Sequence, residues 1–431
     1  MKTKKKWISY CVIGLVGVIL LVAVGMAVYY IVIGKRTLEQ VTTPEEPKVI
    51  FSVYVLTEDR AESIQDTRGY SYGMADSDAD ADAMEQAVSE IADTLGAAPE
   101  IATYENFFAL ADGLREQKSQ AILLNEAYVQ SIAEADGYAW VADGIRRIES
   151  YVLQDTRESG EETEEISVPE DVPDSFTMYI SGIDTFGGLA VRSRSDVNIL
   201  MTVNTRSEEI FMLATPRDYY VEFSQTKGAK DKLAHAGIFG VEASMDALER
   251  LYDIDIDYFL RMNFTGFVDI IDALGGVEVY SEHDFTVKNI RDYHKGYNQL
   301  TGLEALAFAR ERLSFPTGDY QRVKNQMEVI KAVITKCTSP AILKNYRSVM
   351  NAIGESFETN MPEDQILSLI RMQLFGKKEW SISTFTVDGT SAFRSTYTAP
   401  GMELYVILPS TDAVNAAKEK MEQVRQSAAL P

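Results

Sequence analysis

The chain has 431 residues, 46% of them apolar, and carries a formal net charge of −24. This length and composition predict two or three globular domains with a sizeable core, and the acidic balance argues against nucleic acid as a partner. The two cysteines, Cys11 and Cys337, lie far apart in the sequence and build neither a disulfide framework nor a Cys-based metal site.

The first 34 residues predict a membrane anchor. Four lysines in MKTKKK precede an uncharged run from Trp7 to Gly34, and about 20 apolar residues suffice for a helix to cross ~30 Å of hydrocarbon. A buried core helix would be shorter, and a cleaved signal peptide would show an A-x-A site, which is not clear here. Since lysines mark the cytoplasmic side, we expect residues 1–34 to form a cytoplasmic tip and one transmembrane helix, with the rest outside the cell.

Strand-like and helical runs alternate between residues 49 and 153. FSVYVL and AILL have the β-branched, apolar texture of strands, whereas AMEQAVSEIADTL and LADGLREQ have helical spacing. This alternation predicts a small α/β domain at 49–153. Residues 154–175 are acidic, contain Pro169 and Pro173 and carry almost no large apolar side chain, so we expect a linker there.

From Phe176 onward the sequence predicts a sheet covered by helices. TMYISGID, DVNILMTVN and EIFMLAT read as closely spaced strands, and helical segments follow them. The pair Gly275 and Gly276 should end the helix in NFTGFVDIIDALGGVEVY. Thr301 and Glu304 have capping-box spacing, and the tail adds further helices and strands. We therefore expect an α/β fold, with an αβα core domain around a central β-sheet at residues 176–427.

Two common catalytic motifs are absent from the sequence. It contains no H-E-x-x-H and no G-x-x-x-x-G-K-[ST], and only three histidines, His235, His283 and His294. A histidine-based hydrolase or a zinc enzyme is therefore poorly supported.

Acidic residues and arginines instead gather near the ends of predicted strands. The motifs GID, RSRSD, PRDYY and DKLAH and the stretch ARERLSFPTGDYQRVKNQ supply them. Polar residues at strand ends of α/β sheets commonly face a ligand crevice. Carboxylates hold a hard cation such as Mg²⁺, and arginines bind phosphate through bidentate hydrogen bonds. Any one motif alone is typical of a surface ion pair, but together they predict a phosphate or pyrophosphate site.

Helix geometry refines the last cluster. At about 100° per residue, Asp319, Arg322 and Gln326 fall within about 60° of one another, beside an apolar stripe of the same helix. That stripe contains Val323, Met327, Ile330 and Ile334. A partly buried arginine requires an anionic partner, which could be Asp319 or a bound anion.

These residues resemble those of the LytR-CpsA-Psr family. The resemblance rests on GID, RSD, PRD, NFTGFVDIIDALGGV, G-x-x-x-L-T-G-x-x-A-L-x-x-x-R-x-R and GD-x-x-R-x-x-x-Q, in this order across about residues 176–337. One departure is Thr215 in ATPRD, where members more often carry serine. The unit at 49–153 is similar to an accessory domain that some members carry.

The resemblance implies a membrane-anchored, extracytoplasmic phosphotransferase of a Gram-positive type bacterium. Such enzymes transfer an anionic glycopolymer, of the teichoic acid or capsule type, from undecaprenyl pyrophosphate to peptidoglycan and release polyprenyl phosphate. By position, Asp184 and Asp196 would hold Mg²⁺ or Mn²⁺. The pyrophosphate would contact Arg194, Arg217, Lys232, Arg310, Arg312, Arg322 and Gln326. Asp319 would orient the arginines or assist the acceptor hydroxyl, so that the catalytic set is Arg194, Arg217, Asp319 and Arg322.

Three points stay open at this level. Apolar residues such as Leu248, Phe264 and Phe267 suit a polyprenyl pocket, but for any single one of them the sequence favours an ordinary core. The same site would serve a protein that binds polyprenyl phosphates without turnover, for carriage or envelope regulation. It would also serve a polyprenyl pyrophosphate hydrolase, with water replacing the acceptor.

Overall fold

The computed structural model describes most of the chain after the expected membrane anchor. The described residues are 48–76, 81–154, 173–183, 191–339, 349, 357–376 and 380–428. The expected anchor and nearly all of the expected linker lie outside them, and so does Asp184. Within the described part, none of the helices has the length and apolar character required to span a membrane.

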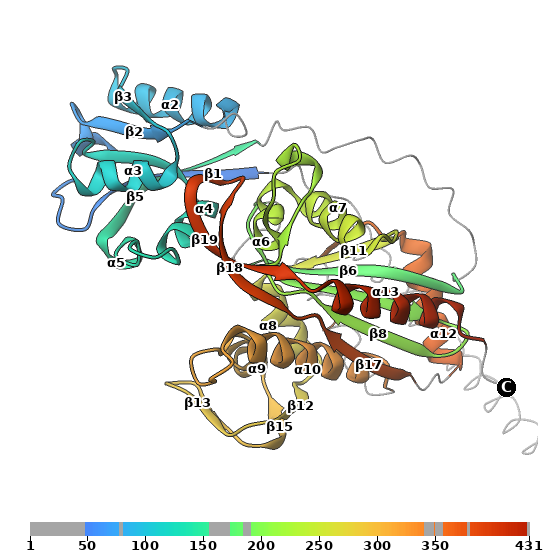
Figure 1. Ribbon diagram of the computed structural model, residues 1–431. Helices are drawn as coiled ribbons and strands as arrows, with labels where there is room; N and C mark the ends of the chain where they lie inside the picture. The colour runs from blue at the N-terminus through green and yellow to red at the C-terminus, as the bar shows by residue number, and fades with distance from the viewer. Residues whose placement is uncertain are drawn as a thin grey trace, which may run out of the picture.

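Residues 48–154 fold around a five-stranded mixed sheet in the order β3-β2-β4-β1-β5 (Figure 1). Its strands are β1 (Lys48–Leu56), β2 (Ser71–Ala75), β3 (Glu100–Tyr104), β4 (Ala121–Asn125) and β5 (Ile145–Gln154). Its helices are η1 (Ile64–Thr67), α2 (Ala81–Leu95), α3 (Phe107–Arg115), α4 (Glu126–Ala133) and α5 (Val141–Gly144). The alternating strands and helices agree with the sequence pattern. That this N-terminal unit, residues 48–154, acts as an accessory domain stays a prediction.

The apolar spacing of α2 explains how the N-terminal unit packs. Met84, Ile91 and Leu95 recur on one face of α2 and are buried against alternate residues of β1, such as Val53. Helices α3 and α4 contribute instead to a different cluster, with the next residue of β1, Tyr54. The pleat of β1 thus sends successive side chains into two separate cores.

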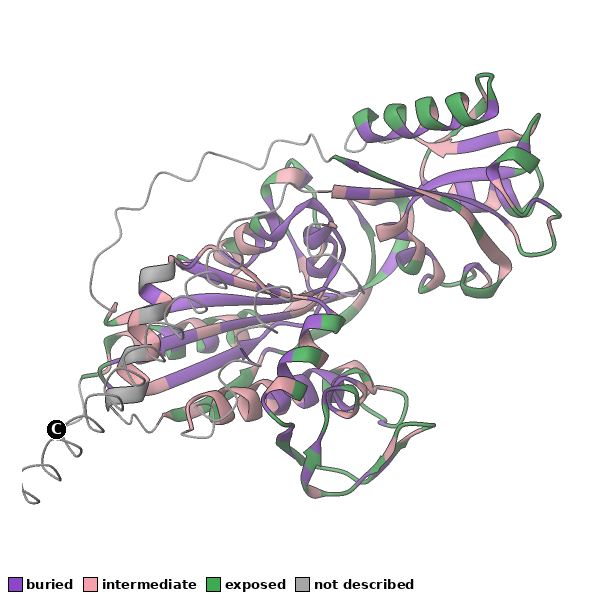
Figure 2. Cartoon of the chain, turned by 180° about the vertical axis from the view of Figure 1, so that it is seen from behind, coloured by how far each residue is buried: buried purple, intermediate pink, exposed green. Residues whose placement is uncertain are grey.

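The second sheet has six strands in the order β16-β11-β6-β7-β8-β17. These strands are β6 (Ser175–Ile183), β7 (Ser195–Asn204), β8 (Glu209–Ala214), β11 (Tyr258–Met262), β16 (Phe357–Thr359) and β17 (Ser381–Thr386). Strands β6, β7 and β8 form an antiparallel meander, while β11 and β17 add in parallel on its two sides. Figure 2 shows these strands largely buried between layers of helices.

Helices cover both faces of the six-stranded sheet. On one face, Tyr179, Leu200 and Phe211 pack with residues of α6 (Leu233–Ala236), α7 (Val241–Tyr252) and α13 (Thr411–Gln426). On the other face, Ile199 and Met212 pack with residues of α10 (Asp319–Cys337) and α12 (Glu363–Gly376). Alternate strand residues therefore serve opposite faces, and the expected αβα arrangement around a central sheet is confirmed.

A small satellite packs against α10. It consists of α8 (Phe264–Ala273), β12 (Val277–Ser281), β13 (Phe285–Val287), β14 (Arg291–Tyr293), β15 (Gly296–Leu300) and α9 (Gly302–Arg310). Gly276 has a φ of +81°, and a Cβ there would lie 2.7 Å from the Leu300 carbonyl oxygen, so this turn requires glycine. Thr301 and Glu304 form the predicted capping box of α9. Both predicted helix boundaries are confirmed.

The hairpin of β18 (Gly389–Thr396) and β19 (Ala399–Pro409) extends from the core domain to the N-terminal unit (Figure 1). Asn106 donates a hydrogen bond to the Pro400 carbonyl at 3.3 Å. Short elements lie between β8 and α7, namely β9 (Tyr220–Val221), η3 (Ser224–Thr226), β10 (Asp231–Lys232) and η4 (Gly237–Phe239). One hydrophobic cluster runs from Phe108 and Ile132 of the N-terminal unit to Leu248 of α7. This continuity holds α4 beside the core domain.

Candidate active site

The antiparallel register of β7 and β8 brings RSRSD and PRD together. Ile199 pairs with Ala214, so the start of β7 meets the end of β8 at one edge of the sheet. Arg194 directly precedes β7, Asp196 is its second residue, and Arg217 follows β8 by three residues. The structure thus places RSRSD and PRD side by side at one edge of the sheet.

Arg217 is the centre of a buried ion-pair cluster. Its Nη1 donates to the two carboxylate oxygens of Asp196 at 3.2 and 3.1 Å. Its Nη2 donates to the two oxygens of Glu134 at 3.3 and 3.2 Å. Arg194 contacts the same two carboxylates, with its Nη1 3.2 Å from Glu134 and its Nη2 3.8 Å from Asp196. The four side chains form a closed, charge-balanced square, which we call the arginine square: Glu134, Arg194, Asp196 and Arg217.

Two further acidic residues surround Arg217. Asp218 forms an ion pair with Lys232 Nζ at 2.8 Å, and its carboxylate lies 3.8 Å from Arg217 Nε. Asp319, the first residue of α10, lies 4.0 Å from the same Nε atom and forms an ion pair with Arg322. The predicted residues from three chain segments therefore meet around one guanidinium.

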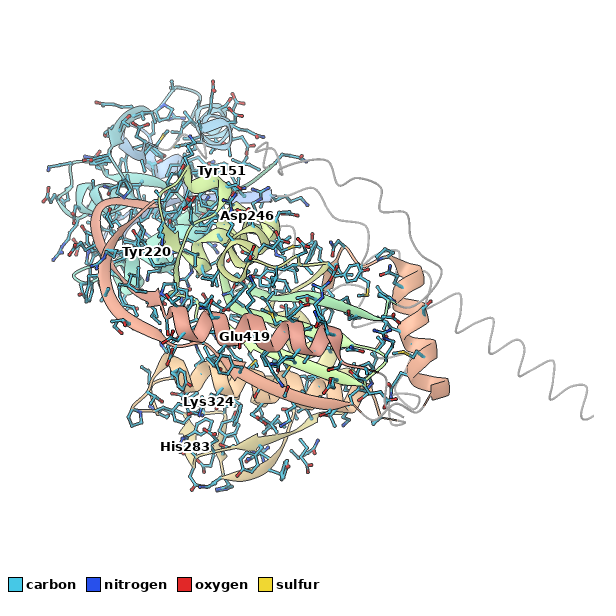
Figure 3. The ribbon with its side chains drawn as sticks, turned by 45° about the vertical axis from the view of Figure 1, so that its right-hand side comes forward. Tyr151, Tyr220, Asp246, His283, Lys324 and Glu419 are labelled. Atoms are coloured by element: carbon cyan, nitrogen blue, oxygen red, sulfur yellow. The ribbon has the colours of Figure 1, made fainter. Side chains whose placement is uncertain are left out.

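The first turns of α10 carry the predicted polar trio to this site. Arg322 and Gln326 are buried beside the core, while Val323 and Met327 pack under the sheet. Lys324 lies on the outer side of α10, where its side chain is 40% exposed (Figure 3). The helical phasing predicted from the sequence is confirmed.

Some buried polar atoms in this cluster lack a partner. Among the described residues, Arg217 Nε and Arg322 Nε are buried and donate no hydrogen bond. Buried polar groups are normally satisfied, and each exception requires an explanation. Two unsatisfied guanidinium donors close to one another are suited to an anionic ligand.

An apolar cavity of about 160 Å³ opens next to the arginine square. Its apolar wall includes Ile180, Val197, Met262, Phe264, Phe267, Leu306 and Ile330. Its polar wall includes Gln130, Glu134, Asp196, Arg310, Arg312, Arg322 and Gln326. The cavity lies between β6, β7, α8, α9 and α10. One part of its lining is apolar, and the other part is polar and charged.

The lining of the cavity shows which of the apolar residues considered for a lipid pocket face it. Phe264 and Phe267 line it, whereas Leu248 is fully buried in the cluster under α7. The Arg310 guanidinium lies over the ring of Phe264, 4.2 Å from its centroid, and covers one side of the cavity. Arg310 itself is exposed, and Arg312 is half-buried.

Burial and charge divide the carboxylates into two kinds. Burial acts to raise the pKa of Asp196, but Arg194 and Arg217 outweigh it and hold that pKa well below its usual range. The pKa of Asp218 is lowered in the same way by Lys232 and Arg217 against its burial. The pKa of Asp319 is raised instead, because its burial outweighs the attraction of Arg322 and Arg217. One carboxyl group with a raised pKa, Asp319, thus lies beside two with lowered pKa values, Asp196 and Asp218.

Two of the residues in the predicted motifs remain to be placed, Asp184 of GID and Arg192 of RSRSD. Asp184 lies outside the described residues, and the described part of the chain contains no cluster of three or more His, Cys, Asp or Glu able to hold a metal ion. Arg192, from the same RSRSD motif, donates to the Phe239 carbonyl at 2.8 Å. His235 contacts Asp231 at 2.7 Å and Thr398 at 2.8 Å, which joins the β18–β19 hairpin to α6.

Sequence reasoning missed Glu134. It follows the last residue of α4, in the N-terminal unit, and no motif marks its surroundings, AEADG. Its position in the site depends on the packing of α4 against the core domain, which no local pattern encodes.

Together, the fold and the site define an α/β protein that presents an arginine-rich anion site beside an apolar cavity. The family model described as "LytR_cpsA_psr family" matches residues 147–423, and the chain belongs to this family. The resemblance noted in the sequence is thereby confirmed.

Known relatives support this assignment. The chain is 35% identical over 233 residues to a protein of Bacillus mycoides (strain KBAB4) named polyisoprenyl-teichoic acid–peptidoglycan teichoic acid transferase TagU, covering 54% of this chain and 74% of the relative. The solved structure of B. subtilis TagV is similar at 25% identity with a TM-score of 0.50, over 61% of this chain and 100% of that one. The structure of TagT bound to LIIa-WTA is similar at 25% identity and a TM-score of 0.50, over 62% and 98%.

Proposed function

We propose that this protein transfers a glycopolymer from a polyprenyl pyrophosphate carrier to peptidoglycan. The observation that carries the proposal is the apolar cavity whose wall also contains the buried Arg322 and, from the arginine square, Glu134 and Asp196. The combination suits an amphiphile with an apolar tail and an anionic head. The name of the similar teichoic acid transferase of Bacillus mycoides specifies the same kind of donor and acceptor.

The cavity suits the part of the lipid next to the pyrophosphate. Ligand pockets commonly measure about 300–1,000 Å³, so a cavity of about 160 Å³ takes only the first units of a long polyprenyl chain. The rest of the chain would extend beyond Phe264 and Phe267 or widen the cavity. A membrane anchor in residues 1–34 would keep the site close to the bilayer that holds this lipid.

The arginines would bind the pyrophosphate. Arg194, Arg217 and Arg322 are fixed by ion pairs before the ligand arrives, and preorganised donors cost little reorganisation during reaction. The unsatisfied Nε atoms of Arg217 and Arg322 would gain phosphate oxygens. Arg310, Arg312, Lys232 and Gln326 lie on the walls of adjoining cavities and would contact the outer oxygens.

The carboxylate of Asp196 is a suitable ligand for a divalent cation. Asp196 stays ionised at the cavity mouth, and Mg²⁺ is often held by one or two carboxylates together with substrate phosphates. We infer that Asp196, with Asp184 as the second ligand, holds Mg²⁺ or Mn²⁺. The bound ion would neutralise charge on the leaving phosphate.

The chemical step follows from the placement of Asp319. An acceptor hydroxyl oxygen of peptidoglycan attacks the sugar-linked phosphorus, and the bond from that phosphorus to the bridging oxygen breaks. Polyprenyl phosphate leaves, and a phosphodiester joins the polymer to peptidoglycan. Asp319, whose raised pKa suits a general base, accepts the hydroxyl proton. Arg322 and Arg217 keep its carboxylate oriented.

A single-turnover assay tests the proposal. The full-length protein in detergent is mixed with a lipid-linked glycopolymer, Mg²⁺ and peptidoglycan fragments, and products are identified by mass spectrometry. We expect a polymer–peptidoglycan conjugate together with polyprenyl phosphate. Tight lipid binding without product would instead establish a carrier or regulatory protein, and free polymer phosphate would establish a hydrolase.

A further inference from the structure

Glu134 occupies the place in the arginine square where a ligand anion would be expected. Its two carboxylate oxygens lie 3.3 and 3.2 Å from Arg217 Nη2, and one of them is also 3.2 Å from Arg194 Nη1. Carboxylate and phosphate present the same paired oxygens to a guanidinium fork. A phosphate group that is to bind both arginines must therefore compete with Glu134.

The family match does not account for this residue. It covers residues 147–423, whereas α4 and Glu134 belong to the N-terminal unit before that span. Figure 1 shows α4 between the N-terminal sheet and the β18–β19 hairpin, close to the core domain. The acidic N-terminal unit thus contributes one carboxylate to the arginine square, whose other three members all come from the core domain.

Glu134 is charged, but its side chain is more exposed than the arginines that it contacts. Arg217 and Arg194 lower the pKa of Glu134 against the effect of its burial, so the competing group is charged. Its side chain is 24% exposed, compared with 4% for Arg194 and 6% for Arg217. Glu134 also lies at the C-terminal end of α4, where the helix dipole disfavours a negative charge.

Glu134 has space into which it can move. It lines the apolar cavity and also a second cavity of about 230 Å³, whose walls include Arg217, Lys232 and Tyr405. Asp196 contacts Arg217 with both oxygens, as Glu134 does, but its side chain is only 14% exposed, compared with 24% for Glu134. Of the two carboxylates in the square, Glu134 is the one that a ligand can displace at the smaller cost.

We propose that Glu134 is an affinity-setting residue that fills the phosphate position between Arg194 and Arg217 until the substrate pyrophosphate displaces it. This inference rests on the proposed function, because it takes the arginines as the pyrophosphate site. It assigns a role to the N-terminal unit: that unit weakens binding at the core-domain site and selects for ligands with enough phosphate charge to compete.

The test measures binding of farnesyl pyrophosphate to the full-length protein in detergent by isothermal titration calorimetry. Glu134→Gln keeps the shape of the side chain but removes its charge. We expect its Kd to fall about fivefold, the upper end of the effect of removing one partly exposed charged competitor. The ligand should also raise the melting temperature of this variant more than that of the wild type, since tighter binding stabilises the folded state more.

Two further variants control the experiment. Glu116→Gln makes the same charge change in the same N-terminal unit, but Glu116 is exposed and paired with Lys118 at 2.6 Å; its Kd should match the wild type. Should Glu134→Gln fail to fold, Glu134→Asp keeps the charge and withdraws the carboxylate by one methylene, and it should show a smaller gain in affinity.

Each outcome separates the inference from the function on which it rests. An unchanged Kd in Glu134→Gln would mean that Glu134 does not compete, and a higher Kd would mean that it holds the arginines in place for the ligand. Either result overturns the proposed role of Glu134 and leaves the transferase proposal intact. Failure of both the wild type and the variant to bind farnesyl pyrophosphate would refute the pyrophosphate site itself.

Discussion

Replacement of Arg322 by alanine tests the centre of the proposed mechanism. Arg322 is buried at the cavity mouth, forms an ion pair with Asp319 and has an unsatisfied Nε. Removing one preorganised donor from a transition-state site typically costs about 10²–10³ in rate, or about 2.7–4 kcal/mol. We expect Arg322→Ala to lower kcat for polymer transfer by this factor. Arg322→Lys should recover only part of the loss, because lysine keeps the charge without the planar fork.

The assay needs a control for charge and for folding. Lys324 lies two residues further along α10 but on its outer side, where it contacts Glu282 at 3.3 Å (Figure 3). An exposed pair of this kind contributes at most about 1 kcal/mol, so Lys324→Ala should keep wild-type activity. Melting curves verify that each variant is folded. A folded Arg322→Ala protein with transfer within threefold of the wild type would refute the assignment of Arg322 to the transition-state site.

Four further predictions follow from the site. Asp319→Asn should abolish transfer, and in the wild type the rate should fall with decreasing pH through the raised pKa of Asp319, because a base must be deprotonated; a pH–rate profile checks both. Asp196→Asn should lower the melting temperature at pH 7 but progressively less toward pH 3, since a carboxylate with a depressed pKa stabilises the fold above its ordinary pKa of about 4 and loses this effect as pH falls. Phe267→Ala should raise KM for a long polyprenyl donor more than for a farnesyl donor, as initial-rate kinetics would show. Chelation by EDTA should stop transfer, and added Mg²⁺ or Mn²⁺ should restore it.

Much of the fold could be predicted because its signals are local. The capping box of Thr301 and Glu304 needs only residues three positions apart, and the glycine pair at 275 and 276 needs only its own φ angles. The phasing of Arg322 against Val323 follows from helix geometry alone. The first strand of the β18–β19 hairpin carries no such local signal, since GTSAFRST in β18 lacks the apolar alternation of a half-buried strand and most of its residues are exposed.

In the site, too, the features with local sequence signals could be predicted and those that depend on packing could not. Arg194, Asp196 and Arg217 could be grouped from the sequence because each flanks a recognisable strand and antiparallel neighbours share an edge. The separation of Phe264 from Leu248 could not be predicted, because both are apolar residues on helices and only the packing decides which faces a cavity. The raised pKa of Asp319 and the lowered pKa of Asp196 likewise depend on burial and on neighbours from other segments.

Glu134 shows that the effect of an acidic residue on an anionic ligand depends on where the fold places it. Its unit belongs to the acidic part of the chain, where residues 35–175 carry 32 acidic against 10 basic side chains. Such a charge would repel an anionic polymer if it acted only as a diffuse field, and salt screens that field at separations beyond about 8 Å at physiological ionic strength. A single carboxylate held 3.2 Å from Arg217 and Arg194 acts below that distance and is not screened. The charge pattern visible in the sequence therefore predicts a weak, general repulsion, whereas the fold converts one residue of that pattern into a direct competitor for the phosphate position.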